Sequence, residues 1–177
     1  MSGNTFADQA GYCTGHAIVA TIAESRLEPN VLPTLCSILE LSAEEGNCSL
    51  ASVASWADGL KSIPRWSWSK ELHFANAVED NPPERCPFPG EKGWIGGEDR
   101  NVLAGIRNTT NLLDQWVQQG KDLSNPVASE ALKFLIHFAG DMHMPFHLTG
   151  RERGANSVNV MWGGKEVREY FCLLLFL

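Results

Sequence analysis

The segment from Ala131 to Met144 combines residues that could do chemistry with residues typical of a protein core. Most of it is apolar, as in a buried helix, yet Lys133, His137 and Asp141 recur every four residues and would lie on one stripe. A buried charge is costly unless it is paired. A His and an Asp four residues apart can bind one divalent metal such as Zn²⁺. The alternative is a Lys133–Asp141 ion pair beside a hydrogen-bonded core histidine.

Further candidate ligands occur elsewhere in the chain. His16, His73 and His147 stand in apolar contexts, whereas His143 falls on a different helical face and is expected at the surface. Asp58 ends an apolar helical segment, where a carboxylate is out of place unless it is paired. Each of these residues taken alone is more often an ordinary core or solvent-facing side chain. Together they favour a His/Asp metal cluster without thiolates, which suits Zn²⁺ and hydrolytic chemistry.

The elements that must position these residues are mostly helical. Apolar spacing predicts helices over 15–27, 31–41, 50–61, 101–119 and 126–144, the fourth opened by an Asn101 or Asp99 cap. The Pro- and Gly-rich segment 62–100 is too long for a structureless loop, and we expect local structure at 66–74. Residues 157–162 alternate like a short strand, and Gly163-Gly164 predicts a turn.

Length and composition exclude several classes of protein. The 177 residues suffice for one domain with a core, and 44% apolar residues exclude an intrinsically disordered chain. The net charge of −7 excludes a broad basic surface for a nucleic-acid backbone. Bound metal could still hold a phosphate locally, because it supplies positive charge inside a cleft.

The cysteines and sequons favour secretion, while the N-terminus does not. The chain has 5 cysteines and no CxxC pair, and glycosylation sequons begin at Asn47 and Asn108. Residues 1–11 lack the basic and apolar regions of a signal peptide. The apolar run 171–177 is far shorter than the about 20 residues that span a bilayer, so no membrane association is expected.

Six short motifs follow one another along the chain: Gly15-His16-Ala17-Ile18-Val19-Ala20, Ala54-Ser55-Trp56-Ala57-Asp58, Leu72-His73-Phe74, Phe134-Leu135-Ile136-His137-Phe138-Ala139-Gly140-Asp141, Met144-Pro145-Phe146-His147 and Gly154-Ala155-Asn156. In this order they resemble the motifs of the fungal and plant single-strand-specific zinc nucleases. This S-one/P-one nuclease family is related in fold to bacterial zinc phospholipase C. The resemblance covers residues 11–164 and implies a mainly α, multi-helix phospholipase C/P-one nuclease-like fold with a metal cleft.

The resemblance implies a three-zinc site and assigns its ligands. One zinc would be bound by the matching residues Asp58, His73, His137 and Asp141. A second would share Asp141 and take His16 together with an N-terminal Trp. The third would take His147 with a later His and Asp. Since only the first set is complete in this chain, we expect about one tightly held Zn²⁺.

The resemblance also implies a reaction and its substrates. Such enzymes hydrolyse phosphodiester bonds of single-stranded DNA and RNA to 5′-phosphates and remove phosphate from 3′-nucleotides. Asp58 and Lys61 match the catalytic positions, although Lys61 could be an ordinary solvated lysine. Phe74 matches the aromatic residue on which a base stacks, although it could be core packing. Asn76 and Asn156 match the positions that hydrogen-bond the base.

Both ends of the chain depart from the family pattern. Gly11 stands where the family has its N-terminal Trp, and no His-Ser-x-x-x-Asp-like segment follows Gly164. The partner of Cys86 would lie in a segment that the sequence lacks. We therefore expect a nuclease domain at 11–164 that is incomplete at its C-terminus. Residues 1–10 and 165–177, on either side of it, would be segments that do not belong to the family. This hypothesis implies that the chain is inactive or poorly folded.

Two other functions remain open at this point. One is a non-catalytic, zinc-stabilised helical binding module, and the other is a phospholipase C-like phosphoesterase. The sequences of the motifs that contain Asp58 and His147 favour the nuclease. We expect a monomer without a protein partner, and the resemblance implies a secreted protein.

Overall fold

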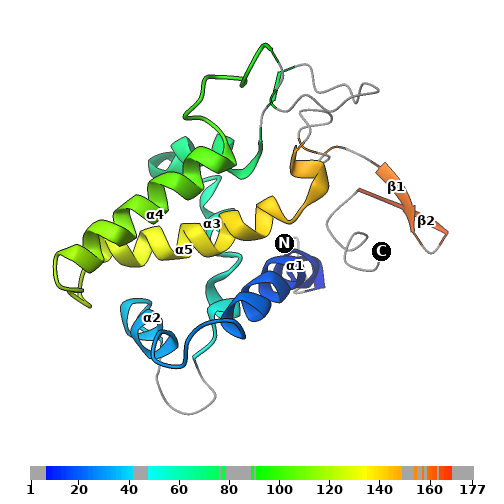
Figure 1. The fold of residues 1–177 in the computed structure, drawn as a ribbon. Helices are drawn as coiled ribbons and strands as arrows, with labels where there is room; N and C mark the ends of the chain where they lie inside the picture. The colour runs from blue at the N-terminus through cyan, green and yellow to red at the C-terminus, as the bar shows by residue number, and fades with distance from the viewer. Residues whose placement is uncertain are drawn as a thin grey trace.

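The computed structural model describes residues 7–41, 48–75, 77–78, 89, 91–148, 154, 157, 159–162 and 164–168. Within them the fold is mainly α, as predicted, with one β-hairpin (Figure 1). The α-helices are α1 (Ala7–Glu24), α2 (Leu32–Ile38), α3 (Trp56–Leu60), α4 (Val102–Gln118) and α5 (Pro126–Met142). The 3₁₀ helices are η1 (Leu50–Val53), η2 (Pro64–His73) and η3 (Pro145–Leu148), and the strands are β1 (Asn159–Trp162) and β2 (Lys165–Arg168).

Helix α5 is the central element of the fold. It packs against α1, α3, α4 and all three 3₁₀ helices, and α4 runs beside it (Figure 1). The two helices approach closely at Gly105, where a Cβ atom would lie 2.9 Å from the Phe138 ring. An element that is contacted on so many sides must be apolar nearly all round, which explains its composition.

Two apolar clusters hold the other elements against α5. The first joins α1, α2, η1 and α4 to one side of it, through Ala20, Ile38, Leu39, Leu50, Ala54, Trp116, Ala128, Leu132 and Ile136. The second joins α3 and α4 to it, through Ala57, Leu60, Val102, Phe134 and Phe138. The helices α1, α3 and α5, which carry four of the candidate ligands, are therefore fixed by the core itself.

Side-chain caps fix the beginnings of α4 and α5. Asn101 Oδ1 accepts a hydrogen bond from the amide of Ala104 at 3.0 Å, which confirms the cap predicted for α4. Asn125 Oδ1 accepts from the amides of Val127 at 3.0 Å and Ala128 at 3.2 Å. Each bond satisfies an amide that has no partner inside its helix.

The N-terminal helix is longer than predicted. It begins at Ala7 rather than Gly15, since no Pro interrupts the chain between them. It ends at Glu24, three residues before the predicted end at Leu27.

The single helix predicted over 50–61 is wrong, because the structure divides it into η1 and α3. The carbonyl of Ala54 accepts from His137 Nδ1 at 2.7 Å, while the amide of Asp58 bonds to the carbonyl of Ser55 at 3.2 Å. A continuous α-helix would pair the Ala54 carbonyl with the Asp58 amide. The break therefore frees a backbone acceptor for His137.

The predicted strand is confirmed as β1, and β2 was not predicted. The two strands are antiparallel, with Trp162 paired to Lys165. Gly164 has a φ of 76° in the intervening turn, a conformation that favours glycine. Strand β2 escaped prediction because it is short and mostly charged, reading Lys-Glu-Val-Arg.

The disulfide and the glycosylation sequons bear on the cellular compartment of the protein. Cys36 and Cys48 form a disulfide across the segment between α2 and η1. Asn108 is exposed on α4, whereas Asn47 and Cys86 lie outside the described residues. No helix in the described part of the chain is long and apolar enough to cross a membrane.

Candidate metal centre

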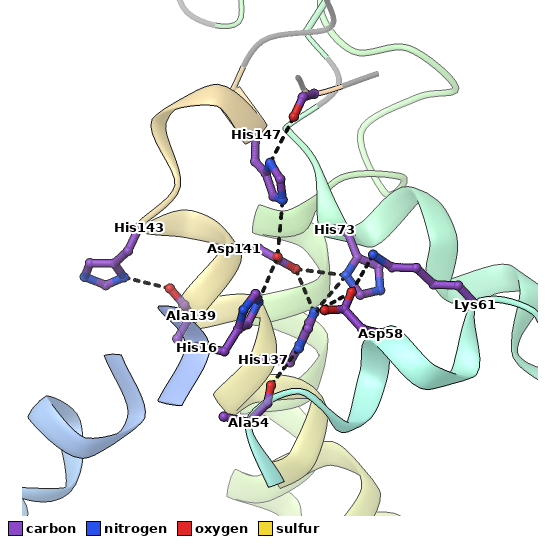
Figure 2. A network of polar contacts seen from close by, with 11 residues as sticks. His16, Ala54, Asp58, Lys61, His73, His137, Ala139, Asp141, His143 and His147 are labelled. Carbon is purple, nitrogen blue, oxygen red and sulfur yellow. Dashed lines mark hydrogen bonds and ion pairs between the residues drawn. The ribbon is translucent and has the colours of Figure 1, made fainter. Parts of the chain in front are cut away.

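Six side chains that the sequence singled out meet beside α5 (Figure 2). Five of them are buried, and Asp58 is 22% exposed. Five different elements supply them: His16 from α1, Asp58 from α3, His73 from the end of η2, His137 and Asp141 from α5, and His147 from η3. The exposed His143 stays outside the cluster, as expected.

Asp141 lies at the centre of the cluster, and its two carboxylate oxygens face different histidines. Oδ1 is 3.1 Å from His16 Nε2 and 3.6 Å from His147 Nε2. Oδ2 is 2.9 Å from His73 Nδ1 and 3.3 Å from His137 Nε2. One carboxylate can therefore serve two neighbouring cation sites, one through each oxygen.

Backbone carbonyls fix which nitrogen of two histidines can bind a metal. His137 Nδ1–H donates to the carbonyl of Ala54 at 2.7 Å, and His147 Nδ1–H donates to the carbonyl of Gly154 at 3.1 Å. In the neutral imidazole the other nitrogen, Nε2, then carries a lone pair. Both Nε2 atoms point towards Asp141 (Figure 2). Lone pairs that converge on a carboxylate repel it unless a cation lies between them.

Among the described residues, two groups of donor atoms are close enough to hold a metal ion. The first is His16, His137 and Asp141, and the second is Asp58, His73 and His137. His73 Nε2 is a buried nitrogen without a hydrogen-bond partner among the described residues, while its Nδ1 faces the cluster. The donors are imidazole nitrogens and carboxylate oxygens, which fit Zn²⁺ and similar divalent metals.

The protonation of the cluster suits a metal site. Burial lowers the pKa of His137 to about 4, despite the opposing charge of Asp141. Burial raises the pKa of Asp141, but the neighbouring His137 and hydrogen bonds from His16 and His73 outweigh it, so the pKa is lowered. At neutral pH His137 is neutral and Asp141 is ionised, so neither must lose a proton to bind a metal.

We expect the metal-free chain to lose stability between pH 6.5 and about 4. The pKa of His137 is lower in the folded chain than its ordinary value of 6.5, so the unfolded chain binds the extra proton first. The contribution of neutral His137 to the free energy of unfolding is complete above pH 6.5. It decreases as the pH drops, by on the order of 2 kcal/mol at pH 5. Urea denaturation at pH 7 and pH 5 measures it.

The matched control for this pH dependence is His143→Gln, which replaces an exposed histidine and should follow the wild-type curve. His137→Gln should make the curve shallower and leave the part that comes from His147, whose pKa is also lowered by burial. Equal wild-type stability at the two pH values would contradict the assignment of His137 as a buried neutral histidine.

Lys61 and Phe74 lie beside the cluster. Lys61 Nζ is 2.6 Å from Asp58 Oδ1 and 5.9 Å from the centre of the Phe74 ring. Phe74 is half-buried and contacts the His147 ring at 4.9 Å between centroids. Burial raises the pKa of Asp58, but His137 and the charge of Lys61 outweigh it, so the pKa is lowered.

The alternative Lys133–Asp141 ion pair is wrong. The Lys133 ammonium lies 5.4 Å from the centre of the Trp56 ring, and Asp141 is surrounded by histidines. The proposed base-binding residues Asn76 and Asn156 lie outside the described residues. The carbonyls of Ala54 and Gly154 were not found from the sequence, because every residue has a carbonyl and only tertiary contact selects these two.

The chain is similar to known proteins over most of its length. The family model described as S1/P1 Nuclease matches residues 12–169. Nuclease P1 of Penicillium citrinum is 36% identical over 150 residues, which are 85% of this chain and 52% of that protein. Endonuclease 3 of Arabidopsis thaliana is 34% identical over 154 residues, 86% of this chain and 49% of that protein.

Nuclease S1 of Aspergillus oryzae (strain ATCC 42149 / RIB 40) is 34% identical over 154 residues, 85% of this chain and 48% of that protein. The chain thus spans about half the length of the curated relatives it matches. Because the family model covers nearly the whole chain and the six motif residues form one cluster, the chain belongs to the S1/P1 nuclease family.

Proposed function

We propose that this chain is the nuclease domain of a zinc-dependent endonuclease and 3′-nucleotidase. Its substrates are single-stranded DNA and RNA and 3′-nucleotides, which it hydrolyses to leave 5′-phosphates on nucleic acids. The observation that carries the proposal is Asp141, whose two oxygens face separate sets of buried histidines. The printed names of the relatives, nucleases and endonucleases, support it.

The metal would be held by His16, Asp58, His73, His137 and Asp141, with His147 at the edge of the same cluster. Bound Zn²⁺ supplies a Lewis acid for the phosphate and lowers the pKa of a water molecule, which makes a nucleophile at neutral pH. The nitrogen and oxygen donors favour Zn²⁺ over Mg²⁺, which prefers oxygen ligands alone.

Side chains around the cluster would position the substrate. The Lys61 ammonium, held by Asp58, is placed to neutralise a phosphate oxygen. The half-buried ring of Phe74 could stack with a base, a contact worth about 1–3 kcal/mol per base whatever the sequence. Bases inside a duplex are already stacked and paired, so a site that needs an exposed base face favours single strands.

Metal removal tests this function. We expect EDTA to abolish cleavage of a single-stranded oligonucleotide and zinc to restore it, with much slower cleavage of the matching duplex. No cleavage by the wild-type chain would contradict this function and agree with the expectation of an inactive, incomplete domain. Asp58→Ala and His137→Ala should remove zinc-dependent cleavage, while Asp114→Ala, at an exposed position on α4, should not. Cleavage that survives EDTA or both site substitutions would contradict the proposal.

The same experiment separates the two alternatives. A binding module would gain thermal stability from zinc without cleaving any oligonucleotide. A phospholipase C-like esterase would hydrolyse a choline phospholipid faster than single-stranded DNA.

We further propose that the protein is a secreted monomer. The disulfide between Cys36 and Cys48 and the exposed sequon at Asn108 support secretion, because both are features of oxidising compartments and the secretory route.

A further inference from the structure

We propose that Gly140 is a positioning residue of the metal centre. Its missing side chain leaves the space in which the His16 ring reaches Asp141. The inference rests on the proposed function, because it concerns how one of the two donor groups is assembled. The position of Gly140 next to Asp141 on α5 does not by itself imply this role.

The His16 ring supplies the three side-chain atoms nearest to the space at Gly140. A Cβ atom at this position would lie 2.5 Å from Cδ2, 3.0 Å from Cγ and 3.2 Å from Nε2 of the His16 ring. Contacts under 3.0 Å do not occur between such atoms, so the ring would have to move. Gly140 is within the regular helix α5, and alanine is a better helix former there than glycine. The backbone alone therefore does not require a glycine.

The His16 ring has little freedom to move aside. It stacks on the ring of His137, with centroids 4.1 Å apart and planes 17° from parallel. Its Nε2 atom lies 3.1 Å from Asp141 Oδ1. The ring is thus confined between the His137 ring and the backbone of α5 at Gly140, and a displacement would take Nε2 away from the carboxylate.

Only one of the two donor groups depends on this space. His16 belongs to the group with His137 and Asp141, while Asp58 and His73 form the other group with the same His137 and approach from α3 and η2. The Cβ of an alanine at 140 would meet the His16 ring, and no atom of Asp58 or His73 is among its three nearest contacts. The substitution should therefore weaken the His16 group most, since the other group shares only His137 with it.

Gly105 provides a matched control on the neighbouring helix. It is also a helical glycine whose Cβ would be too close to a ring, at 2.9 Å from Phe138. Its close contacts are apolar side chains, Phe138 and Leu72, rather than a candidate ligand. Gly105→Ala thus reproduces the packing strain of Gly140→Ala without touching the His16 ring.

A zinc titration against a chromophoric chelator tests the proposal on the full chain. We expect wild type to bind one ion tightly and a second more weakly. Gly140→Ala should weaken the second event by roughly 10- to 100-fold, the usual effect of losing a group that orients a metal ligand, and leave the first within twofold. His16→Ala should lose the same event. Gly105→Ala should keep both.

A double variant keeps the test valid if Gly140→Ala does not fold. Gly140→Ala combined with His16→Ala removes the ring that the new methyl group meets. It should therefore fold with the melting temperature of His16→Ala and bind the first ion normally. A double variant that stays unfolded would overturn the proposal, because Gly140 would then be needed for packing unrelated to His16.

The remaining outcomes also decide between the hypotheses. Unchanged binding of both ions by Gly140→Ala would overturn the role of Gly140, as would a wild-type chain that binds one ion only. A wild-type chain that binds no zinc would instead overturn the proposed function.

Discussion

Asp141→Asn should bind zinc far more weakly than wild type and lose at least roughly 1,000-fold in cleavage of single-stranded DNA. This factor corresponds to about 4 kcal/mol of lost transition-state stabilisation, the scale expected when a catalytic metal is removed. The substitution keeps the size of the side chain but replaces an anion with a neutral amide. One of the two oxygens becomes an NH₂ group, which cannot bind a cation.

The effect should be large because Asp141 faces four histidines from four elements. Oδ1 faces His16 and His147, and Oδ2 faces His73 and His137. The loss of the charge therefore removes a ligand from every donor set in which this carboxylate takes part. A substitution such as His16→Ala should cost less, since it affects one set only.

Elemental analysis and initial rates on a single-stranded oligonucleotide measure the effect. Asp114→Asn, at an exposed position on α4, is the matched control and should keep full zinc content and rate. Circular dichroism establishes that both variants are folded. A folded Asp141→Asn protein with wild-type zinc content would contradict the central position of this carboxylate.

Phe134→Ala should lower the free energy of unfolding by about 3–5 kcal/mol, the usual cost of removing a buried aromatic ring. Phe134 is 2% exposed. Its ring centroid lies 5.1 Å from that of Trp56, 5.3 Å from Trp68 and 5.3 Å from Phe138. The cavity cannot close easily, because large rings from α3, η2 and α5 surround it.

The same substitution should also weaken zinc binding. Phe134 holds α3 and η2 against α5, and these two elements carry Asp58 and His73. Urea denaturation followed by tryptophan fluorescence gives the stability, and the chelator titration gives the affinity. Val117→Ala removes a side chain that is 47% exposed on α4 and should change stability by less than about 0.5 kcal/mol. A Phe134→Ala protein as stable as Val117→Ala would contradict the assigned packing.

Much of the helical fold could be predicted because its signals are local. The cap at Asn101 and the apolar spacing of α5 are read from neighbouring residues. The break between η1 and α3 could not be predicted, since it depends on His137, which lies 83 residues from Ala54 in the chain and takes the Ala54 carbonyl. Apolar spacing continues through the break, so only the long-range hydrogen bond distinguishes the two arrangements.

The candidate site shows the same division. His and Asp residues in apolar contexts identified the six side chains of the cluster, and the order of six motifs pointed to the nuclease family to which the chain belongs. The reason is physical: a polar group in an apolar segment needs a partner, and residue types limit the partner to a few chemistries. No such signal marks the space at Gly140, because a glycine inside a helix does not reveal which side chain packs against it.

The sequence by itself thus determined which residue types were available, which two of them lie one helical turn apart on α5, and which metals those donors suit. The tertiary structure alone decided how Asp141 divides its oxygens among histidines as far as 125 residues away in the chain. It also decided that Nε2, rather than Nδ1, of His137 faces the cluster. These choices depend on hydrogen bonds and packing between elements distant in sequence, and no local pattern contains them.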